Sequence, residues 1–198
     1  LAGSKVVCYI HGEEITTSMS QAGSFGMRRA RTLQRADAII AVSRFTRDAL
    51  VSQMGVDPAR ICLLENGVDT RRFAPGPVDE AFRARHGLTG KRVVLEVGRL
   101  VARKGFDRTV DAWPQIRASV PDAHLLIVGE GPLGPALRAR AEQLGVADSI
   151  TFAGALDDAE LLAAYRSADL FAMPNRTMPD GDTEGFGLVF LEANACGR

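Results

Sequence analysis

The chain alternates short apolar runs with segments of helical periodicity. The runs that suit buried strands lie at 6–10, 38–42, 61–64, 92–97, 124–128, 149–152 and 170–173. Segments with apolar residues every three or four positions lie at 27–36, 45–54, 79–86, 106–119, 133–144 and 157–167, with a last one from 186. This alternation predicts βαβ units and an α/β fold with parallel sheets. Pro114 lies inside one predicted helix and should kink or restart it.

The alternation is interrupted between residues 66 and 77. Asn66-Gly67-Val68-Asp69 has turn chemistry, and Phe73-Ala74-Pro75-Gly76-Pro77 is a stiff stretch that suits a linker. We therefore predict two Rossmann-like, doubly wound domains, at residues 1–75 and 76–198. Both are expected to be incomplete, because Leu1 is not an initiator Met and Arg198 stops just past a predicted helix. The chain is interpreted as an internal fragment.

Composition narrows the class of protein. The 198 residues are 46% hydrophobic, enough for a substantial core, and 24 Lys and Arg balance 24 Asp and Glu. This balance argues against nucleic acid as a partner and against a general attraction to anionic membranes. Cys8, Cys62 and Cys196 are far apart in apolar runs, which predicts reduced core thiols and a cytoplasmic location. No apolar stretch approaches the roughly 20 residues that span a bilayer.

A basic loop follows the predicted strand at 92–97. It begins at Gly98-Arg99 and includes Lys104, so both cations fall at the carboxyl edge of a strand, where α/β sheets bind ligands. The planar guanidinium of an arginine and the ammonium of a lysine together could neutralise the charge of a departing diphosphate. A solvated basic loop is the alternative that spacing alone leaves open.

Two carboxylates, Glu184 and Glu192, flank the start of the last predicted helix. With a start near Phe186, Glu184 would precede the helix and Glu192 would lie about two turns along it. The backbone N–H groups of Phe186, Gly187 and Leu188 would then be unpaired donors that suit phosphate or sugar oxygens.

Taken in order, these motifs resemble the GT4 family of retaining glycosyltransferases, which have the GT-B fold. The resemblance rests on Gly98-Arg99 with Lys104, on Gly129-Glu130-Gly131-Pro132, and on the Glu-x7-Glu pair Glu184 and Glu192. Further similar segments are His11-Gly12-Glu13-Glu14, Val42-Ser43, and Asn66-Gly67-Val68-Asp69 ahead of Phe73. The resemblance covers the whole chain, and it is the order and spacing of the motifs that make it specific.

The resemblance implies a hexosyltransferase that uses a nucleotide diphosphate sugar, with GDP-mannose and UDP-glucose as expected donors. Gly98, Arg99 and Lys104 would bind the diphosphate, and Glu192 the ribose diol. Glu184 and the amides of residues 186–188 would contact the transferred sugar, Gly154-Ala155-Leu156 the base, and His11 would project beside the sugar. The acceptor would be a glycan, a lipid or a small molecule, and neither a cofactor nor a metal is expected. The alternative for His11 is a histidine of the core, with its ring nitrogens hydrogen-bonded there.

Two further motifs are discounted. Gly129-Glu130-Gly131-Pro132-Leu133-Gly134 matches the dinucleotide fingerprint G-x-G-x-x-G, but it follows the second strand of its domain, and no convincing ribose-binding acid comes about 20 residues later. Asp180-Gly181-Asp182 resembles the metal-binding Asp-x-Asp of a different fold, yet it lies in a Pro- and Gly-rich loop.

A basic cluster occupies one predicted helix near the start of the chain. It consists of Arg28, Arg29, Arg31 and Arg35. A solvated helix face is the plainer interpretation, and peripheral contact with anionic lipid at the inner face of the membrane is the sharper one.

Several alternatives to a glycosyltransferase stay open. They are a GT-B sugar-phosphate synthase or phosphorylase-like enzyme, a nucleotide-sugar-binding module without catalysis, and an NAD-dependent reductase. The base, the sugar, the acceptor and the oligomeric state are not fixed by these motifs.

Overall fold

A computed structural model describes residues 3–12, 15 and 24–198 of the chain. They form two compact units. The first contains residues up to Gly67 together with the loop Thr177–Gly187, and the second contains Val68–Arg176 and Leu188–Arg198. Each unit has its own parallel sheet.

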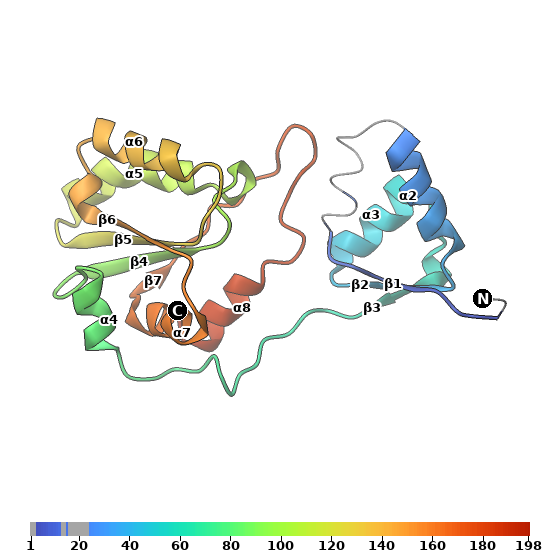
Figure 1. Cartoon of the computed structure of the whole chain (residues 1–198), viewed down its shortest axis with the longest axis horizontal. Helices are drawn as coiled ribbons and strands as arrows, with labels where there is room; N and C mark the ends of the chain where they lie inside the picture. Colours follow the sequence, from blue (N-terminus) through green and yellow to red (C-terminus); the bar gives the residue numbers. More distant parts are fainter. Residues whose placement is uncertain (1–2, 13–14, 16–23) are drawn as a thin grey trace. The chain divides into compact units, whose positions relative to one another are not determined.

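The first unit is built on three parallel strands in the order β1 (Val7–Ile10), β2 (Ala38–Ala41) and β3 (Ile61–Leu63). Helices α2 (Ser24–Arg35) and α3 (Arg44–Met54) pack on the sheet through apolar residues that include Leu33, Leu50 and Ile39 (Figure 1). Sequence chemistry sets both ends of α3. The Ser43 hydroxyl accepts from the Thr46 N–H at the start, and Gly55 adopts a left-handed conformation at the end.

The cysteine prediction is correct for Cys196 and wrong for Cys62. All three thiols are free, and Cys196 is buried, but Cys62 is exposed and Cys8 is half-buried. Cys62 is in register with Ile40, whereas the neighbouring Ile39 is fully buried under the helices. Since side chains alternate across a strand, Cys62 points away from the helix-covered face.

The second unit has four parallel strands in the order β6 (Ile150–Gly154), β5 (Ala123–Val128), β4 (Arg92–Val97) and β7 (Leu170–Phe171). The apolar residues of β4 and β5 are buried or half-buried, as expected for central strands of a sheet covered on both faces. These strands lie close to the ranges predicted from the apolar runs.

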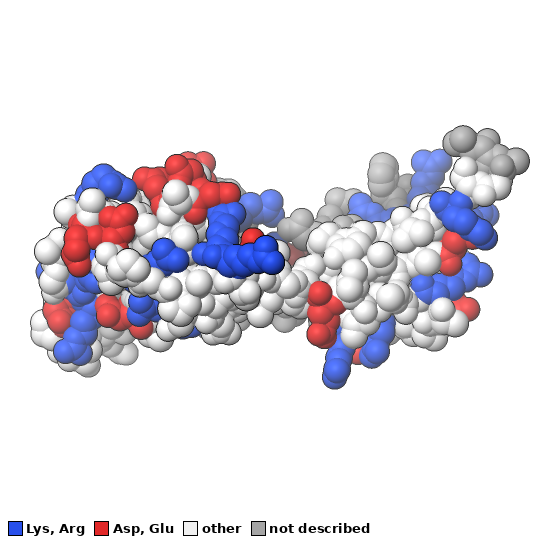
Figure 2. All heavy atoms as spheres, turned by 90° about the horizontal axis from the view of Figure 1, so that it is seen from below, with Lys and Arg blue, Asp and Glu red and all other residues white. Residues whose placement is uncertain are grey.

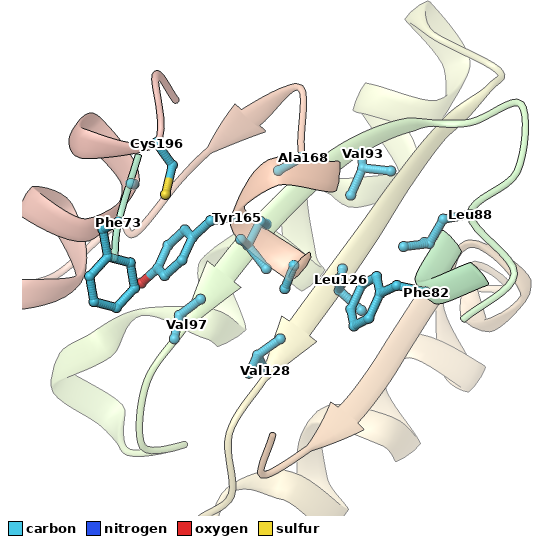
Figure 3. Packing of buried hydrophobic residues seen from close by; sticks show 13 residues of the cluster. Phe73, Phe82, Leu88, Val93, Val97, Leu126, Val128, Tyr165, Ala168 and Cys196 are labelled. Carbon is cyan, nitrogen blue, oxygen red and sulfur yellow. The ribbon is translucent and has the colours of Figure 1, made fainter. Parts of the chain in front are cut away.

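Helices cover both faces of this sheet (Figure 1). On one face lie α5 (Phe106–Ser119) and α6 (Gly134–Gln143), packed around the fully buried Trp113. On the other lie α4 (Glu80–Arg85), α7 (Asp158–Ser167) and α8 (Leu188–Ala195). Figure 3 shows this second core, in which the rings of Phe73, Phe82 and Tyr165 pack against strand residues. The α/β fold with parallel sheets is thus confirmed.

Two helix predictions need correction. Helix α5 runs unbroken through Pro114, so the chain does not restart there. Proline removes one hydrogen bond, and the helix is held by the burial of Phe106, Val110 and Trp113 before the proline and by the packing of Ile116 after it. Helix α8 begins at Leu188, two residues later than predicted, because Gly187 has φ +79° and cannot be part of a right-handed helix.

Candidate functional site

The carboxyl ends of β4, β5 and β6 bring three glycines together. Val97 is in register with Val128, and Val128 with Gly154. Beyond the strands, the Gly98 N–H bonds the Val128 carbonyl at 3.0 Å and the Gly129 N–H bonds the Gly154 carbonyl at 2.7 Å. A Cβ added at Gly129 would overlap the Gly98 carbonyl, so the backbones of the loops at residues 98 and 129 lie in direct contact.

This contact explains the glycines of the G-x-G-x-x-G match. A Cβ at Gly131 would lie 2.6 Å from the Leu100 carbonyl oxygen, while the Leu100 N–H bonds the Glu130 carbonyl at 2.9 Å. The first two glycines of the motif therefore let the 129–131 segment pack on the loop that follows β4.

The predicted diphosphate cations lie on that loop. Arg99 is exposed, whereas Lys104 ends a short 3₁₀ helix (Ala102–Lys104) and is only 8% exposed. The Lys104 side chain runs beside Gly98, because a Cβ there would lie 3.6 Å from its Cε. The structure thus places Gly98 and Lys104 together at the carboxyl edge of the sheet.

The segment after β7 holds the Lys104 turn in place. A Cβ at Gly105 would overlap the Pro174 carbonyl oxygen, so these two backbones also touch. Arg176 donates its N–H to the Arg103 carbonyl at 2.8 Å and its Nη1 to Asp107 Oδ2 at 2.8 Å. One bond therefore ties residue 176 to the turn, and the other ties it to the first turn of α5.

A cavity of about 450 Å³ opens at the same edge. Its lining includes Leu100, the glycines at 129, 131 and 154, and the side chains of Glu130 and Arg138. The Arg138 guanidinium lies 4.4 Å from the centroid of the Phe152 ring. The cavity adjoins the Gly154-Ala155-Leu156 segment that the sequence predicts to hold a nucleobase.

Glu192 lies on α8, one helical turn after its start rather than two. Its Oε2 accepts a 2.6 Å hydrogen bond from the phenol of Tyr165, which is fully buried on α7. Burial and the neighbouring carboxylate both raise the pKa of Tyr165, so the phenol stays protonated and donates.

In the first unit, the loop that carries Glu184 packs against the end of β1. A Cβ at Gly185 would lie 2.7 Å from the His11 carbonyl oxygen, and Gly185 accepts a 2.9 Å hydrogen bond from the Ser43 hydroxyl. The structure thus brings His11, Ser43 and the Glu184-Gly185 segment together within this unit. Glu13 and Glu14, next to His11 in the sequence motif, lie outside the described residues.

Comparison with known proteins identifies the family. Residues 78–198 match the family described as glycosyl transferases group 1, and residues 1–72 match Glycosyltransferase Family 4. The chain belongs to the glycosyl transferases group 1 family. This confirms the family-level resemblance of its motifs.

Two curated relatives illustrate the range of this glycosyltransferase family. The chain is 43% identical, over 98% of its length and 50% of the relative, to a GDP-mannose-dependent alpha-(1-6)-phosphatidylinositol monomannoside mannosyltransferase of Mycolicibacterium smegmatis. It is 38% identical, over 81% of its length and 35% of the relative, to a D-inositol 3-phosphate glycosyltransferase of Segniliparus rotundus. The chain therefore spans about half the length of the first of these relatives.

A solved structure of the same GT-B architecture matches almost all of the chain. Anabaena HepE in complex with UDP and glucose superposes with a TM-score of 0.82 at 25% identity, covering 98% of this chain and 51% of that one. The likeness supports assignment of the chain to the GT-B fold.

The remaining residues predicted to bind the donor are divided between the two units. Leu188 begins α8 of the second unit, while Phe186 and Gly187 end the loop of the first. Phe186 and Gly187 precede the helix rather than begin it, and the donor role of their N–H groups stays a prediction. Leu156 follows β6 and packs against the core beneath α7.

Asp180-Gly181-Asp182 forms a turn. The Asp182 N–H bonds Asp180 Oδ1 at 3.1 Å, and the Gly181 N–H bonds the Met178 carbonyl. Among the residues that the structure describes, no group of three or more His, Cys, Asp or Glu side chains could hold a metal ion. Independence of a metal stays a prediction.

The sequence analysis missed one buried acidic residue. Glu96, on β4, is fully buried, and its Oε1 accepts a 2.5 Å hydrogen bond from the Thr109 hydroxyl. Two nearby carboxylate oxygens, Glu96 Oε2 and Asp107 Oδ1, are buried without a hydrogen-bond partner among the described residues. Burial raises the Glu96 pKa to about 8, and the charge of Asp107 adds to the rise. A carboxylate inside an apolar strand was the signal that could have found it.

Proposed function

We propose that the full-length protein is a retaining hexosyltransferase that moves mannose from GDP-mannose to a hydroxyl of an inositol-containing acceptor lipid. The observation that carries the proposal is the Lys104 turn, a nearly buried cation held at the carboxyl edge of a sheet in a member of this family. Lysine carries a compact positive charge, and the carboxyl ends of parallel strands are where α/β sheets bind ligands, so a donor diphosphate suits this place.

The donor's diphosphate would lie against the loop that follows β4. Arg99 and Lys104 would bind its oxygens, and the closely packed glycines would let the phosphates approach the backbone. The base would lie beside Gly154-Ala155-Leu156, in the cavity of about 450 Å³ that adjoins this segment. Glu192 would accept bonds from the ribose diol.

Catalysis would come from positioning and electrostatic stabilisation. As the bond between the anomeric carbon and the diphosphate breaks, Arg99 and Lys104 would stabilise the growing charge on the leaving group. The acceptor oxygen would attack from the same face, and its proton would pass to the departing phosphate. Glu184 and His11 would hold the transferred sugar.

The donor and the acceptor are proposed from the relatives. The M. smegmatis relative is named for GDP-mannose and a phosphatidylinositol monomannoside, and the S. rotundus relative for inositol 3-phosphate. We propose guanine as the base and an inositol-containing acceptor for this chain. We also propose that the reaction needs neither a metal nor a cofactor and takes place in the cytoplasm.

Peripheral contact with anionic lipid is a further part of the proposal. Arg28, Arg31 and Arg35 are exposed on α2, next to Met27, which is 61% exposed. On the face that Figure 2 draws, Lys and Arg lie among Asp and Glu. No helix in the described part of the chain is long and apolar enough to cross a membrane.

The lipid contact can be tested by liposome flotation of the full-length protein. Binding should rise with the content of anionic lipid and fall when all four arginines of α2 are replaced by Gln. Flotation that does not respond to anionic lipid would remove this part of the proposal.

The central experiment is calorimetry of the full-length protein against GDP, UDP and ADP, followed by transfer assays with the matching sugar nucleotides. We expect tight binding of GDP, loss of binding in Glu192→Ala, and no change in Glu142→Ala, which alters an exposed glutamate on α6. NMR of the product should show a retained anomeric configuration. Preference for another nucleotide would overturn the choice of donor, and absence of transfer from any sugar nucleotide would overturn the activity.

A further inference from the structure

Tyr165 lies where it can control the carboxylate proposed to bind ribose. Its phenol oxygen is 2.6 Å from Glu192 Oε2 and 3.5 Å from the Val189 carbonyl oxygen. A phenol has one proton, and the short contact with the ionised acceptor is the stronger of the two. Tyr165 therefore donates to Glu192.

The ring of Tyr165 is itself fixed. Phe73 packs edge-on against it with a centroid distance of 5.9 Å, and the ring of Phe171 of β7, tilted by 50°, lies at the same centroid distance. Figure 3 shows Tyr165 between the sheet and Phe73. Because the ring is fully buried and packed against two neighbours, its hydroxyl is fixed in one position.

Glu192, in contrast, is half-buried on α8 and would otherwise be free to rotate. Its Oε1 accepts no hydrogen bond from any residue that the structure describes. Arg72, whose charge acts on Glu192, is already engaged, since it pairs with Asp158 at 2.7 Å and lies over the Phe73 ring. One carboxylate oxygen is thus held by the core while the other remains available to a ligand.

We infer that Tyr165 is a positioning residue that orients the Glu192 carboxylate for the ribose hydroxyls of the donor. This inference rests on the proposed role of Glu192. The buried phenol restricts the carboxylate to one rotamer before the nucleotide arrives, so less conformational freedom is lost on binding. Tyr165 does not touch the donor and acts through Glu192 alone.

The test compares GDP with 2′,3′-dideoxy-GDP, which lacks the ribose diol, by calorimetry on the full-length protein. In Tyr165→Phe we expect binding of GDP to weaken roughly three- to tenfold, while binding of the dideoxy nucleotide is unchanged. The ratio of the dissociation constant of the dideoxy nucleotide to that of GDP should therefore fall. In transfer assays, KM for the donor should rise and kcat should change little.

Matched variants separate positioning from general damage. Tyr9→Phe changes the other tyrosine of the chain, which is 42% exposed and bonded to Asn66, and it should keep the parent's ratio. The double variant Glu192→Gln with Tyr165→Phe should bind GDP as tightly as Glu192→Gln alone, because the two residues act as one unit.

The outcomes distinguish this inference from the proposed function. Equal weakening of both nucleotides in Tyr165→Phe would show a purely structural role and overturn the inference. An unchanged ratio in Tyr165→Phe, with the ratio lost in Glu192→Gln, would overturn it while leaving the ribose role of Glu192 intact. If the parent binds both nucleotides equally well, that ribose role fails and the inference fails with it.

Discussion

The hydroxyl of Ser43 donates a 2.9 Å hydrogen bond to the carbonyl of Gly185, 142 residues later in the chain. The same hydroxyl accepts the Thr46 N–H at the start of α3. One side chain therefore both begins a helix and holds the loop that carries Glu184. This double role makes Ser43 a test of whether the position of that loop matters for transfer.

Replacing Ser43 with Ala should lower stability by about 1 kcal/mol through the lost helix cap and lower kcat by roughly tenfold through a displaced loop. Ser43→Thr should preserve both, since it keeps the hydroxyl. Ser52→Ala, which removes a hydroxyl bonded to the Asp48 carbonyl on the same helix, should leave kcat unchanged. Chemical denaturation and steady-state kinetics of the full-length protein measure the two effects, and a normal kcat in Ser43→Ala would contradict the role given to the loop.

Gly105→Ala should be strongly destabilising. Its φ of +79° disfavours any side chain, and a Cβ would also overlap the Pro174 carbonyl. Gly90→Ala is the matched control, because Gly90 has φ +71° but open space around its Cβ position. We expect a loss of about 1 kcal/mol for Gly90→Ala and on the order of 3 kcal/mol or more for Gly105→Ala.

The fluorescence of Trp113, the single tryptophan and a fully buried one, reports the unfolding of the second unit in both variants. Similar losses in the two variants would mean that the 102–105 turn can move away from Pro174.

Glu96→Gln should change how stability depends on pH. The folded state raises the Glu96 pKa to about 8 from an ordinary value of 4.5, so between these values the unfolded chain releases a proton that the folded chain retains. The parent therefore loses stability as pH rises from about 5 to about 8, by up to roughly 1.4 kcal/mol per pH unit from this group. A neutral glutamine removes that slope while its oxygen can still accept from Thr109.

Denaturation of Glu96→Gln at pH 5 and pH 8 checks this expectation. The variant should gain stability relative to the parent as pH rises, while Glu142→Gln, on the exposed face of α6, should follow the parent at both values. A parallel pH dependence of Glu96→Gln and the parent would mean that Glu96 is ionised in the folded state.

Lys104→Ala and Glu184→Ala should each lower turnover by orders of magnitude, because one removes charge stabilisation of the leaving diphosphate and the other removes a contact with the sugar. Lys91→Ala is the matched control, since Lys91 lies at the amino end of β4, away from the proposed site. Initial rates with GDP-mannose and the proposed lipid acceptor measure the effect. Near-normal rates in either variant would contradict the role assigned to its residue.

The sequence by itself determined the elements and their order. Apolar runs became strands because continuous burial in a parallel sheet requires them, and the ranges predicted for β4 and α5 agree with those observed. It also determined which loops carry the motifs, because ligand loops follow the carboxyl ends of strands. The family followed from motif order, since each motif is defined locally and needs no knowledge of packing.

Only the tertiary structure decided which side chains support those motifs. Tyr165 and Glu192 are 27 residues apart, and Gly105 and Pro174 still further, so no local period links them. The start of α8 at Leu188 and the exposure of Cys62 likewise depended on a left-handed glycine and on which sheet face the helices cover. Hydrophobic periodicity reports which face of an element is buried, whereas packing between elements selects the residues that meet there.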